Sequence, residues 1–592
     1  MFTGLRLIMR NKLRSLSEKN KLLILSLVVG ISSGLAAVLL ETLVKAIHHG
    51  LTSWFDGARD YYLYLVYPGI GMLLSLLILK FIVKDNIGHG VTKVLVAISK
   101  NESRIKPHNM WSSILTSSLT IGFGGSVGAE APIVYTGAAI GSNFARYMGM
   151  SYRNITILLG CGAAGAVAGI FKAPLAGVLF TLEILLFNIS MTSMMPLLLS
   201  TVSATMVSYI FLGDSLPFEC TLMPFDIKNV PFYVLLGFFC GACSLYFLRT
   251  TLKLEDRLGK MKNPYTKWAF CAAGLGLLIF LFPPLYGEGY DPLSPLLNGQ
   301  EISYDGESML AFMLHKPWMV PVFFALILIL KVFSMTFTNA GGGVGGTFGP
   351  TLFVGAIAGF LLARVTNLLL AGSEFTVPEQ NFVLVGMAGL MAGVMQAPMT
   401  AIFLIAEISG GYELFIPLII TATISFGTIR FFEKYSIYTK RIAMTGDLLT
   451  HDSDQAVLTL LKVSDVVETN FSPVSIDATL GEFVQVISSS ARNIFPVVDS
   501  RNHLQGYVSL EDVRKDMFRQ DLYGKMHVYN YMKSSPAYVY DGEKMDSVMS
   551  KFESTDAWNL PVVKKDRTYI GFVSKSKIFS AYRNELKELS QD

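Results

Sequence analysis

Residues 124–132 read GGSVGAEAP and place one carboxylate, Glu130, within a long apolar region. The glycines leave backbone N–H groups accessible, and Pro132 suits the first turn of a helix. Free N–H groups at a helix start attract anions. A carboxylate in an apolar membrane segment is costly and by default marks an ion or proton pathway. The stretch therefore predicts an anion site in which Glu130 competes with the anion.

The composition around this stretch is that of an integral membrane protein. Of the 592 residues, 52% are hydrophobic and 16% are charged, and the mean hydropathy is +0.48. A soluble protein has about 25% charged residues. The main apolar runs are residues 22–47, 63–83, 232–248, 320–336 and 414–424. A spanning helix needs about 20 residues, so the shorter runs predict an all-α, multi-pass protein with broken helices.

Basic residues lie at both ends of the apolar region. Those that precede the first run are Arg6, Arg10, Lys12, Arg14, Lys19 and Lys21. Those that close the last run are Arg430, Lys434, Lys440 and Arg441. Because basic residues favour the cytoplasmic side, we predict a multi-pass protein of the plasma membrane with both termini in the cytoplasm. No A-x-A-like cleavage site follows the basic N-terminus, which predicts a retained first helix.

The membrane part, which we place at residues 1–445, contains an internal repeat. Residues 165–169 (GAVAG) precede Pro174 and Glu183, and residues 389–393 (GLMAG) precede Pro398 and Glu407 at the same displacement. Two related halves with broken helices are typical of transporter folds, in which the substrate binds at the interface between repeats. We therefore predict two structurally related halves.

Hydropathy falls after about residue 445, and residues 446–592 are predicted to form a soluble domain. Residues 496–498 (PVV) recur as 561–563, and residues 506–509 (GYVS) recur as GFVS at 571–574. Each copy reads as helix, strand, turn, strand and helix. The tail is therefore predicted to be α/β, with copies at about residues 461–520 and 528–586.

Several enzyme-like patterns lack the context that their chemistry requires. Residues 124–128 fit G-x-S-x-G, which needs a preceding strand and a catalytic triad, and residues 160–165 and 341–346 fit G-x-G-x-x-G, which needs a βαβ unit. The five cysteines lie in or beside apolar segments and predict packing. We expect no enzyme activity, no metal site and no nucleic-acid partner.

The motifs together resemble those of the CLC family of chloride channels and chloride/proton antiporters, of the prokaryotic type. Residues 128–132 (GAEAP) resemble the family motif G-[RK]-E-G-P, and residues 346–350 (GTFGP) resemble G-x-F-x-P. Residues 173–177 with Glu183, and residues 436–439 (SIYT), resemble further family blocks. The tail resembles a pair of CBS domains. The resemblance implies a CLC fold, with two inverted repeats and broken helices, and a homodimer with a pore in each subunit.

The resemblance also implies roles for particular residues. Glu130 would be the gating glutamate, and backbone amides near it and near Phe348 would bind chloride. The implied chloride-binding positions are His89, Gly90, Ala129, Glu130, Thr347, Phe348 and Tyr438. Two of these have other interpretations, since Tyr438 could be an interfacial tyrosine and His89 a structural histidine.

The chain departs from the family pattern at three positions. His89 stands where a serine usually binds chloride, and Ala129 stands where an arginine or lysine precedes the gate. Ile184 replaces the inner proton-transfer acid of many antiporters, at a position that faces an aqueous vestibule in relatives. We therefore expect selective chloride transport that is channel-like or weakly coupled to protons. A coupled chloride/proton antiporter is the alternative.

The soluble tail allows more than one function. Ser509 and Asp512 match the Ser/Thr and Asp that contact nucleotide in CBS domains, whereas the second copy has Ser574 and Lys577. An adenine nucleotide at the first copy is one expectation, and a structural CBS pair without nucleotide is the other. A tail that senses nucleotide or ionic strength is a third possible function.

Overall fold

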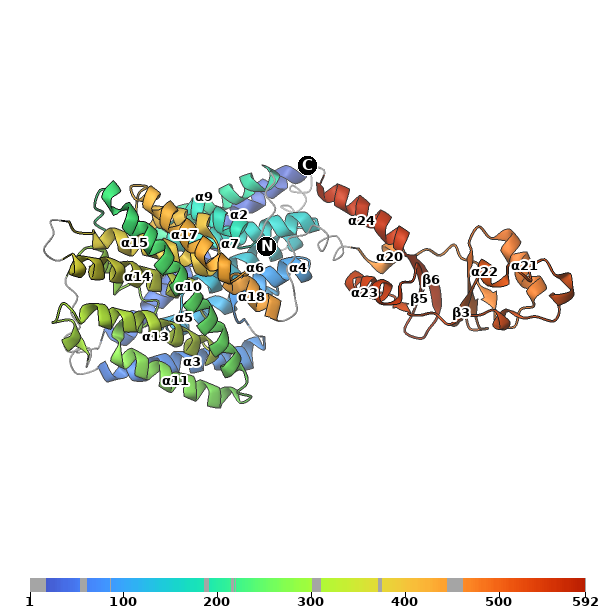
Figure 1. Cartoon of the computed structure of the whole chain (residues 1–592), viewed down its shortest axis with the longest axis horizontal. Coiled ribbons are helices and arrows are strands. Elements are labelled where there is room, and N and C mark those ends of the chain that lie inside the picture. Colours follow the sequence, from blue (N-terminus) through green and yellow to red (C-terminus); the bar gives the residue numbers. More distant parts are fainter. Residues whose placement is uncertain are drawn as a thin grey trace, which may run out of the picture. The chain divides into compact units, whose positions relative to one another are not determined.

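The computed structural model describes residues 17–53, 61–85, 87–185, 191–214, 218, 220–300, 310–370, 375–444 and 461–590. The chain divides into two compact units, Met1–Leu449 and Thr450–Asp592 (Figure 1). The described part of the first unit is helical, and the second unit contains two small sheets. The fold class expected from the sequence, helical membrane domain plus α/β tail, is confirmed.

The first half of the membrane unit contains α2 (Glu18–Thr52), α3 (Tyr67–Leu77), α4 (Gly90–Lys100), α5 (Ser112–Gly122), α6 (Glu130–Tyr147), α7 (Tyr152–Phe171), α8 (Pro174–Glu183) and α9 (Met191–Leu212). The second half contains α10 (Val230–Gly259), α11 (Pro264–Leu281), α12 (Leu293–Leu297), α13 (Val320–Ala340), α14 (Phe348–Leu369), α15 (Glu379–Met395), α16 (Pro398–Ile408), α17 (Phe415–Phe432) and α18 (Ile437–Met444). Across the described ranges, nine helical segments are long and apolar enough to cross a membrane.

The sequence repeat is also a repeat of backbone conformation. Helix α7 ends before Lys172, whose φ is 54°, and α15 ends before Gln396, whose φ is 53°. Both residues adopt the left-handed conformation that commonly ends a helix. A proline then begins the next helix in each half, at Pro174 in α8 and at Pro398 in α16. The two halves therefore interrupt their helices at equivalent places.

Helices α8 and α16 cap each other. The Glu183 carboxylate, at the end of α8, accepts hydrogen bonds from the N–H groups of Met399 (3.0 Å) and Thr400 (2.7 Å) at the start of α16. In return, the Glu407 carboxylate accepts from Leu175 (3.0 Å) and Ala176 (2.9 Å) at the start of α8. Carboxylates at helix N-termini are favourable because the N–H groups there lack partners within the helix.

These reciprocal caps also fix the relative direction of the two helices. The end of each helix lies at the start of the other, so α8 and α16 run antiparallel. Because the two helices occupy equivalent positions in the repeat, the two halves have opposite orientations. This arrangement agrees with the inverted repeat that the family resemblance implies.

The second unit contains the same three-stranded sheet twice. The first sheet has the order β1 (Val474–Ser475), β2 (Ile494–Val498), β3 (Leu504–Ser509), and the second has the order β4 (Val539–Tyr540), β5 (Asn559–Val563), β6 (Tyr569–Ser574). In each sheet the first pair is parallel and the second is antiparallel. Helices α21 (Leu480–Ser489) and α23 (Met545–Thr555) connect the first and second strands of their sheets.

Candidate functional site

The two glycine-rich loops of the repeat meet in space. The Gly128 N–H donates to the Gly346 carbonyl (3.1 Å), and the Gly346 N–H donates to the Gly128 carbonyl (2.7 Å). Each loop leads directly into a helix, α6 or α14. Pro132 and Pro350 occupy the third position of these helices, where no N–H is needed. The paired loops therefore bring two helix N-termini together, an arrangement suited to binding an anion.

The Glu130 side chain occupies one of these N-termini. It is 3% exposed, and its Oε2 accepts a hydrogen bond from the Gly349 N–H of α14 (3.2 Å). Its Oε1 accepts from the Tyr290 hydroxyl (2.5 Å). A β-carbon on Gly128 would overlap Glu130 Oε2, and one on Gly349 would lie 3.0 Å from Oε1. Glycine at both positions therefore gives the carboxylate room to bind the α14 amide.

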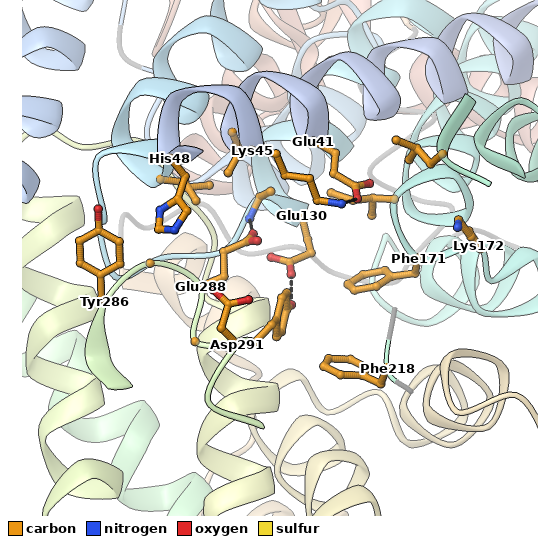
Figure 2. A pocket seen from close by; sticks show the side chains of 18 residues that line it. Glu41, Lys45, His48, Glu130, Phe171, Lys172, Phe218, Tyr286, Glu288 and Asp291 are labelled. Atoms are coloured by element: carbon orange, nitrogen blue, oxygen red, sulfur yellow. Dashed lines mark hydrogen bonds and ion pairs between the residues drawn. The ribbon is translucent and has the colours of Figure 1, made fainter. Parts of the chain in front are cut away.

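The other N-terminus carries a second carboxylate. Glu288 Oε1 accepts a hydrogen bond from the Ala129 N–H (2.9 Å), immediately before α6. Glu288 and Tyr290 belong to the segment between α11 and α12, which follows the short 3₁₀ helix η5 (Pro283–Leu285). Figure 2 shows the side chains of Glu130 and Glu288 beside one another. Each of the two helix starts thus has its own carboxylate.

Both carboxylates line a cavity of about 400 Å³. Its titratable and charged lining residues, apart from tyrosines, are Glu41, Lys45, His48, Glu130, Lys172, Glu288 and Asp291. Figure 2 shows Glu41, Lys45 and His48 projecting from α2 toward this space. The cavity gives the Glu130 and Glu288 side chains room to leave the amides that they bind.

A buried cation lies behind the paired loops. Lys331, in the apolar helix α13, is fully buried, and its Nζ donates to Ser126 Oγ (2.8 Å) and to the Gly287 carbonyl (3.2 Å). The same Nζ lies 4.9 Å from the centroid of the Phe353 ring. Lys331 therefore connects the segment that carries Glu130 to the one that carries Glu288. It also places a basic group near the loop in which Ala129 replaces the usual basic residue.

Two buried hydroxyls lie at the starts of α14 and α18. Thr347 and Tyr438 are each 2% exposed, and their hydroxyls lie close to each other, but neither makes a hydrogen bond of good geometry with any described residue. An unpaired buried hydroxyl is costly. Thr347 is the N-cap residue of α14, and Tyr438 lies in the first turn of α18. These donors fit an anion bound between the two helices.

The backbone and the ring of His89 have different surroundings. It is the N-cap residue of α4, and a β-carbon on the next residue, Gly90, would overlap the Ala131 carbonyl of α6. The α4 start therefore packs against the α6 start. The His89 ring, however, lies 3.5 Å from the Glu255 carboxylate, which also binds the Arg441 guanidinium (2.6 and 3.1 Å). The structure thus places the ring beside an ion pair.

Ile184 does not face water. It is 4% exposed and packs within the main apolar core, directly after α8. The expectation that this position borders an aqueous vestibule, which came from relatives, is wrong for the conformation described here. An acid at this position would be buried among apolar side chains.

Sequence reasoning missed Glu288, Tyr290 and Lys331, and it included Gly349 only as part of the motif at residues 346–350. Lys331 had a usable signal, because a lone lysine in an apolar run marks a functional site by default. Glu288 also had a usable signal, because it lies between two glycines, and Glu130 likewise follows a glycine-rich stretch. Their partners could not have been found from spacing, because Tyr290 and Glu130 are far apart in the chain.

In the second unit, Ser509 and Asp512 bind each other. The Ser509 N–H and hydroxyl donate to Asp512 Oδ2 (3.1 and 2.8 Å), and Lys533 Nζ donates to Oδ1 (2.5 Å). Burial would raise the pKa of Asp512, but the Lys533 and Ser509 hydrogen bonds hold that pKa below its usual range. A nucleotide at this site would have to replace or extend these contacts.

The equivalent position of the second copy is different. The Ser574 hydroxyl donates to Glu468 Oε1 (2.8 Å), and the Lys577 N–H donates to Ser574 Oγ (3.1 Å). Glu468 also pairs with Arg492 (2.5 Å). The Ser574 hydroxyl, which a ribose would contact in a nucleotide-binding CBS domain, is therefore already bound to a carboxylate from outside the second copy.

Comparisons with known proteins agree with this architecture. The family model described as voltage gated chloride channel matches residues 70–430, and the CBS domain model matches residues 463–519 and 528–584. A putative chloride channel protein ClcB-like from Ralstonia nicotianae is 27% identical over 434 residues, 71% of this chain and 96% of that protein. The H(+)/Cl(-) exchange transporter ClcA of Vibrio cholerae is 25% identical over 423 residues, 68% of this chain and 84% of that protein.

A solved structure supports the fold. The crystal structure of a slow cyanobacterial Cl-/H+ antiporter matches with a TM-score of 0.62 at 22% identity, over 73% of this chain and 99% of that one. The resemblance that the sequence motifs indicate is confirmed, because the channel family model alone spans more than half of the chain. The chain belongs to the voltage gated chloride channel (CLC) family and carries two CBS domains.

Proposed function

We propose that this protein transports chloride selectively across the membrane through a pathway gated by Glu130. The observation that carries the proposal is the Glu130 carboxylate on the Gly349 N–H at the start of α14. A helix N-terminus is suited to an anion, so Glu130 and chloride would compete for the same amide. Ala129, Phe348 and the hydroxyls of Thr347 and Tyr438 would supply further chloride contacts, and Gly90 would supply part of the pathway wall.

We base the proposed coupling mode on the absence of an acid at position 184. Ile184 offers no proton acceptor and is buried, which favours a channel-like or weakly proton-coupled pathway. A coupled chloride/proton antiporter remains the alternative, because the relatives include proteins described as a channel and as an H(+)/Cl(-) exchange transporter. A homodimer in the plasma membrane, with cytoplasmic CBS domains that bind adenine nucleotide or sense ionic strength, completes the proposal.

Chloride efflux from liposomes tests the gate. We expect Glu130→Gln to raise chloride efflux and to flatten its dependence on external pH, because the amide side chain no longer presents a negative competitor. The matched control is Glu407→Gln, which changes another carboxylate that caps a helix start but lies outside the cavity. Wild-type efflux and pH dependence in Glu130→Gln would show that Glu130 is not the gate.

The reversal potential in the same liposomes tests the coupling. A reversal at the chloride Nernst potential that does not move with a proton gradient indicates an uncoupled pathway. A reversal that moves with the proton gradient supports the antiporter alternative.

A further inference from the structure

Glu288 binds the start of α6 in the same way that Glu130 binds the start of α14. Glu130 binds the N–H of Gly349 at the start of α14, and Glu288 binds the N–H of Ala129 immediately before α6. We propose that Glu288 is a second gating carboxylate, which must leave the Ala129 amide before an anion can bind there. This inference rests on the proposed function of Glu130 and extends it to the other helix start.

The Glu288 side chain lies between a rigid backbone turn and an open cavity. Its neighbours Gly287 and Gly289 have φ values of 60° and 92°, a backbone region that residues with side chains rarely adopt. Glu288 is partly exposed and lines the same 400 Å³ cavity as Glu130 (Figure 2). Gly287 is held by Gly124 and Lys331, so the backbone of the segment is anchored. The cavity beside the Glu288 side chain provides the space into which its carboxylate can rotate.

Charge links the two carboxylates. Glu288 lies within the electrostatic field of Glu130, and like charges at short range repel. Lys331 donates to the carbonyl of Gly287, next to Glu288, and to Ser126 in the loop before Glu130. An anion that displaces one carboxylate therefore changes the electrostatic field at the other.

A purely structural cap is the competing explanation. Glu183 and Glu407 also bind backbone amides at helix starts, yet neither lines the cavity. A structural cap contributes stability and leaves chloride binding unchanged when it is removed. A gating carboxylate competes with chloride, so its removal tightens chloride binding.

The test uses purified full-length protein, with chloride binding measured by isothermal titration and chloride efflux measured from liposomes. The variants are Glu288→Ala, Glu288→Gln, Glu130→Gln and the control Glu407→Gln. We expect Glu288→Ala to bind chloride about tenfold more tightly. The Ala129 N–H no longer donates to a charged carboxylate, so chloride has no competitor for it. Glu288→Gln should show a smaller gain, because its carbonyl oxygen still accepts from the Ala129 N–H. Glu407→Gln should bind chloride as the wild type does.

The outcomes separate this inference from the proposed function. Wild-type chloride affinity in both Glu288 variants, with thermal stability lowered as in Glu407→Gln, overturns the inference and makes Glu288 a structural cap. Unchanged efflux and affinity in Glu130→Gln alone overturn the Glu130 gate, whatever Glu288 does. If Glu288→Ala does not give a monodisperse protein, Glu288→Gln decides, because it keeps the size of the side chain and one acceptor.

Discussion

The hydroxyl of Tyr290 offers a direct way to weaken the Glu130 contact without removing the carboxylate. Tyr290→Phe deletes one hydrogen bond, of 2.5 Å, to Glu130 Oε1 and leaves the Gly349 bond at 3.2 Å. The Tyr290 ring packs edge-on against Phe218 with 5.3 Å between centroids, and phenylalanine preserves this packing. The substitution therefore isolates the contribution of the hydroxyl.

The size of the effect follows from the burial of the pair. Glu130 is 3% exposed, and a hydrogen bond to a charged group contributes about 1.5–3 kcal/mol. Removing it should shift the equilibrium between bound and displaced Glu130 by about 10-fold to 150-fold. Chloride that competes with Glu130 should then bind more tightly, by at most the same factor of about 10 to 150, and chloride efflux should rise.

The assay is chloride titration and liposome efflux on Tyr290→Phe beside the wild type. Tyr246→Phe is the matched control, since it removes a hydroxyl that donates to the Ile329 carbonyl (3.0 Å), away from the cavity. The reasoning is refuted if Tyr290→Phe binds and conducts chloride as the wild type does while Glu130→Gln alters both.

Two further predictions concern the rest of the chain. Glu183→Ala should lower the free energy of unfolding by about 1–2 kcal/mol, because the α16 start loses its cap. Denaturant unfolding in detergent would check this, with Glu413→Ala, which changes an exposed glutamate, as the control. Equal losses of stability in the two variants would contradict the prediction. For Glu468, burial would raise the pKa, but the Ser574 and Arg492 hydrogen bonds hold the pKa lower than usual. Its stabilisation is therefore present above the unfolded pKa of about 4.3 and lost as pH falls below it. Hydrogen exchange in β6 should show this loss in the wild type and not in Glu468→Gln, and parallel losses in both would contradict it.

Local sequence patterns were sufficient for much of the fold. The repeat displacement from Pro174 to Pro398 predicted matching helix starts, because proline and the preceding glycine-rich run act through the backbone itself. Glu130 was identifiable because a carboxylate in an apolar run is unusual whatever its partners. Its gating role stays a prediction.

Features that depend on tertiary contacts were out of reach. The direction of the His89 ring is set by Glu255 on α10 and Arg441 on α18, which no spacing connects to it. Burial of Ile184 depends on the packing of the apolar core around the end of α8. The Glu288 bond to the Ala129 N–H joins segments that are distant in the chain, so only the folded protein reveals it.

The reciprocal caps of α8 and α16 have a consequence for biosynthesis. The N–H groups at the start of α8 find their acceptor on Glu407, which the ribosome adds long after α8 has been made. N–H groups at a helix start lack partners within the helix and need a cap or water. The first half of the membrane unit therefore completes its helix caps only after the second half has been synthesised. Separately expressed halves would accumulate as stable protein only when they are synthesised in the same cell.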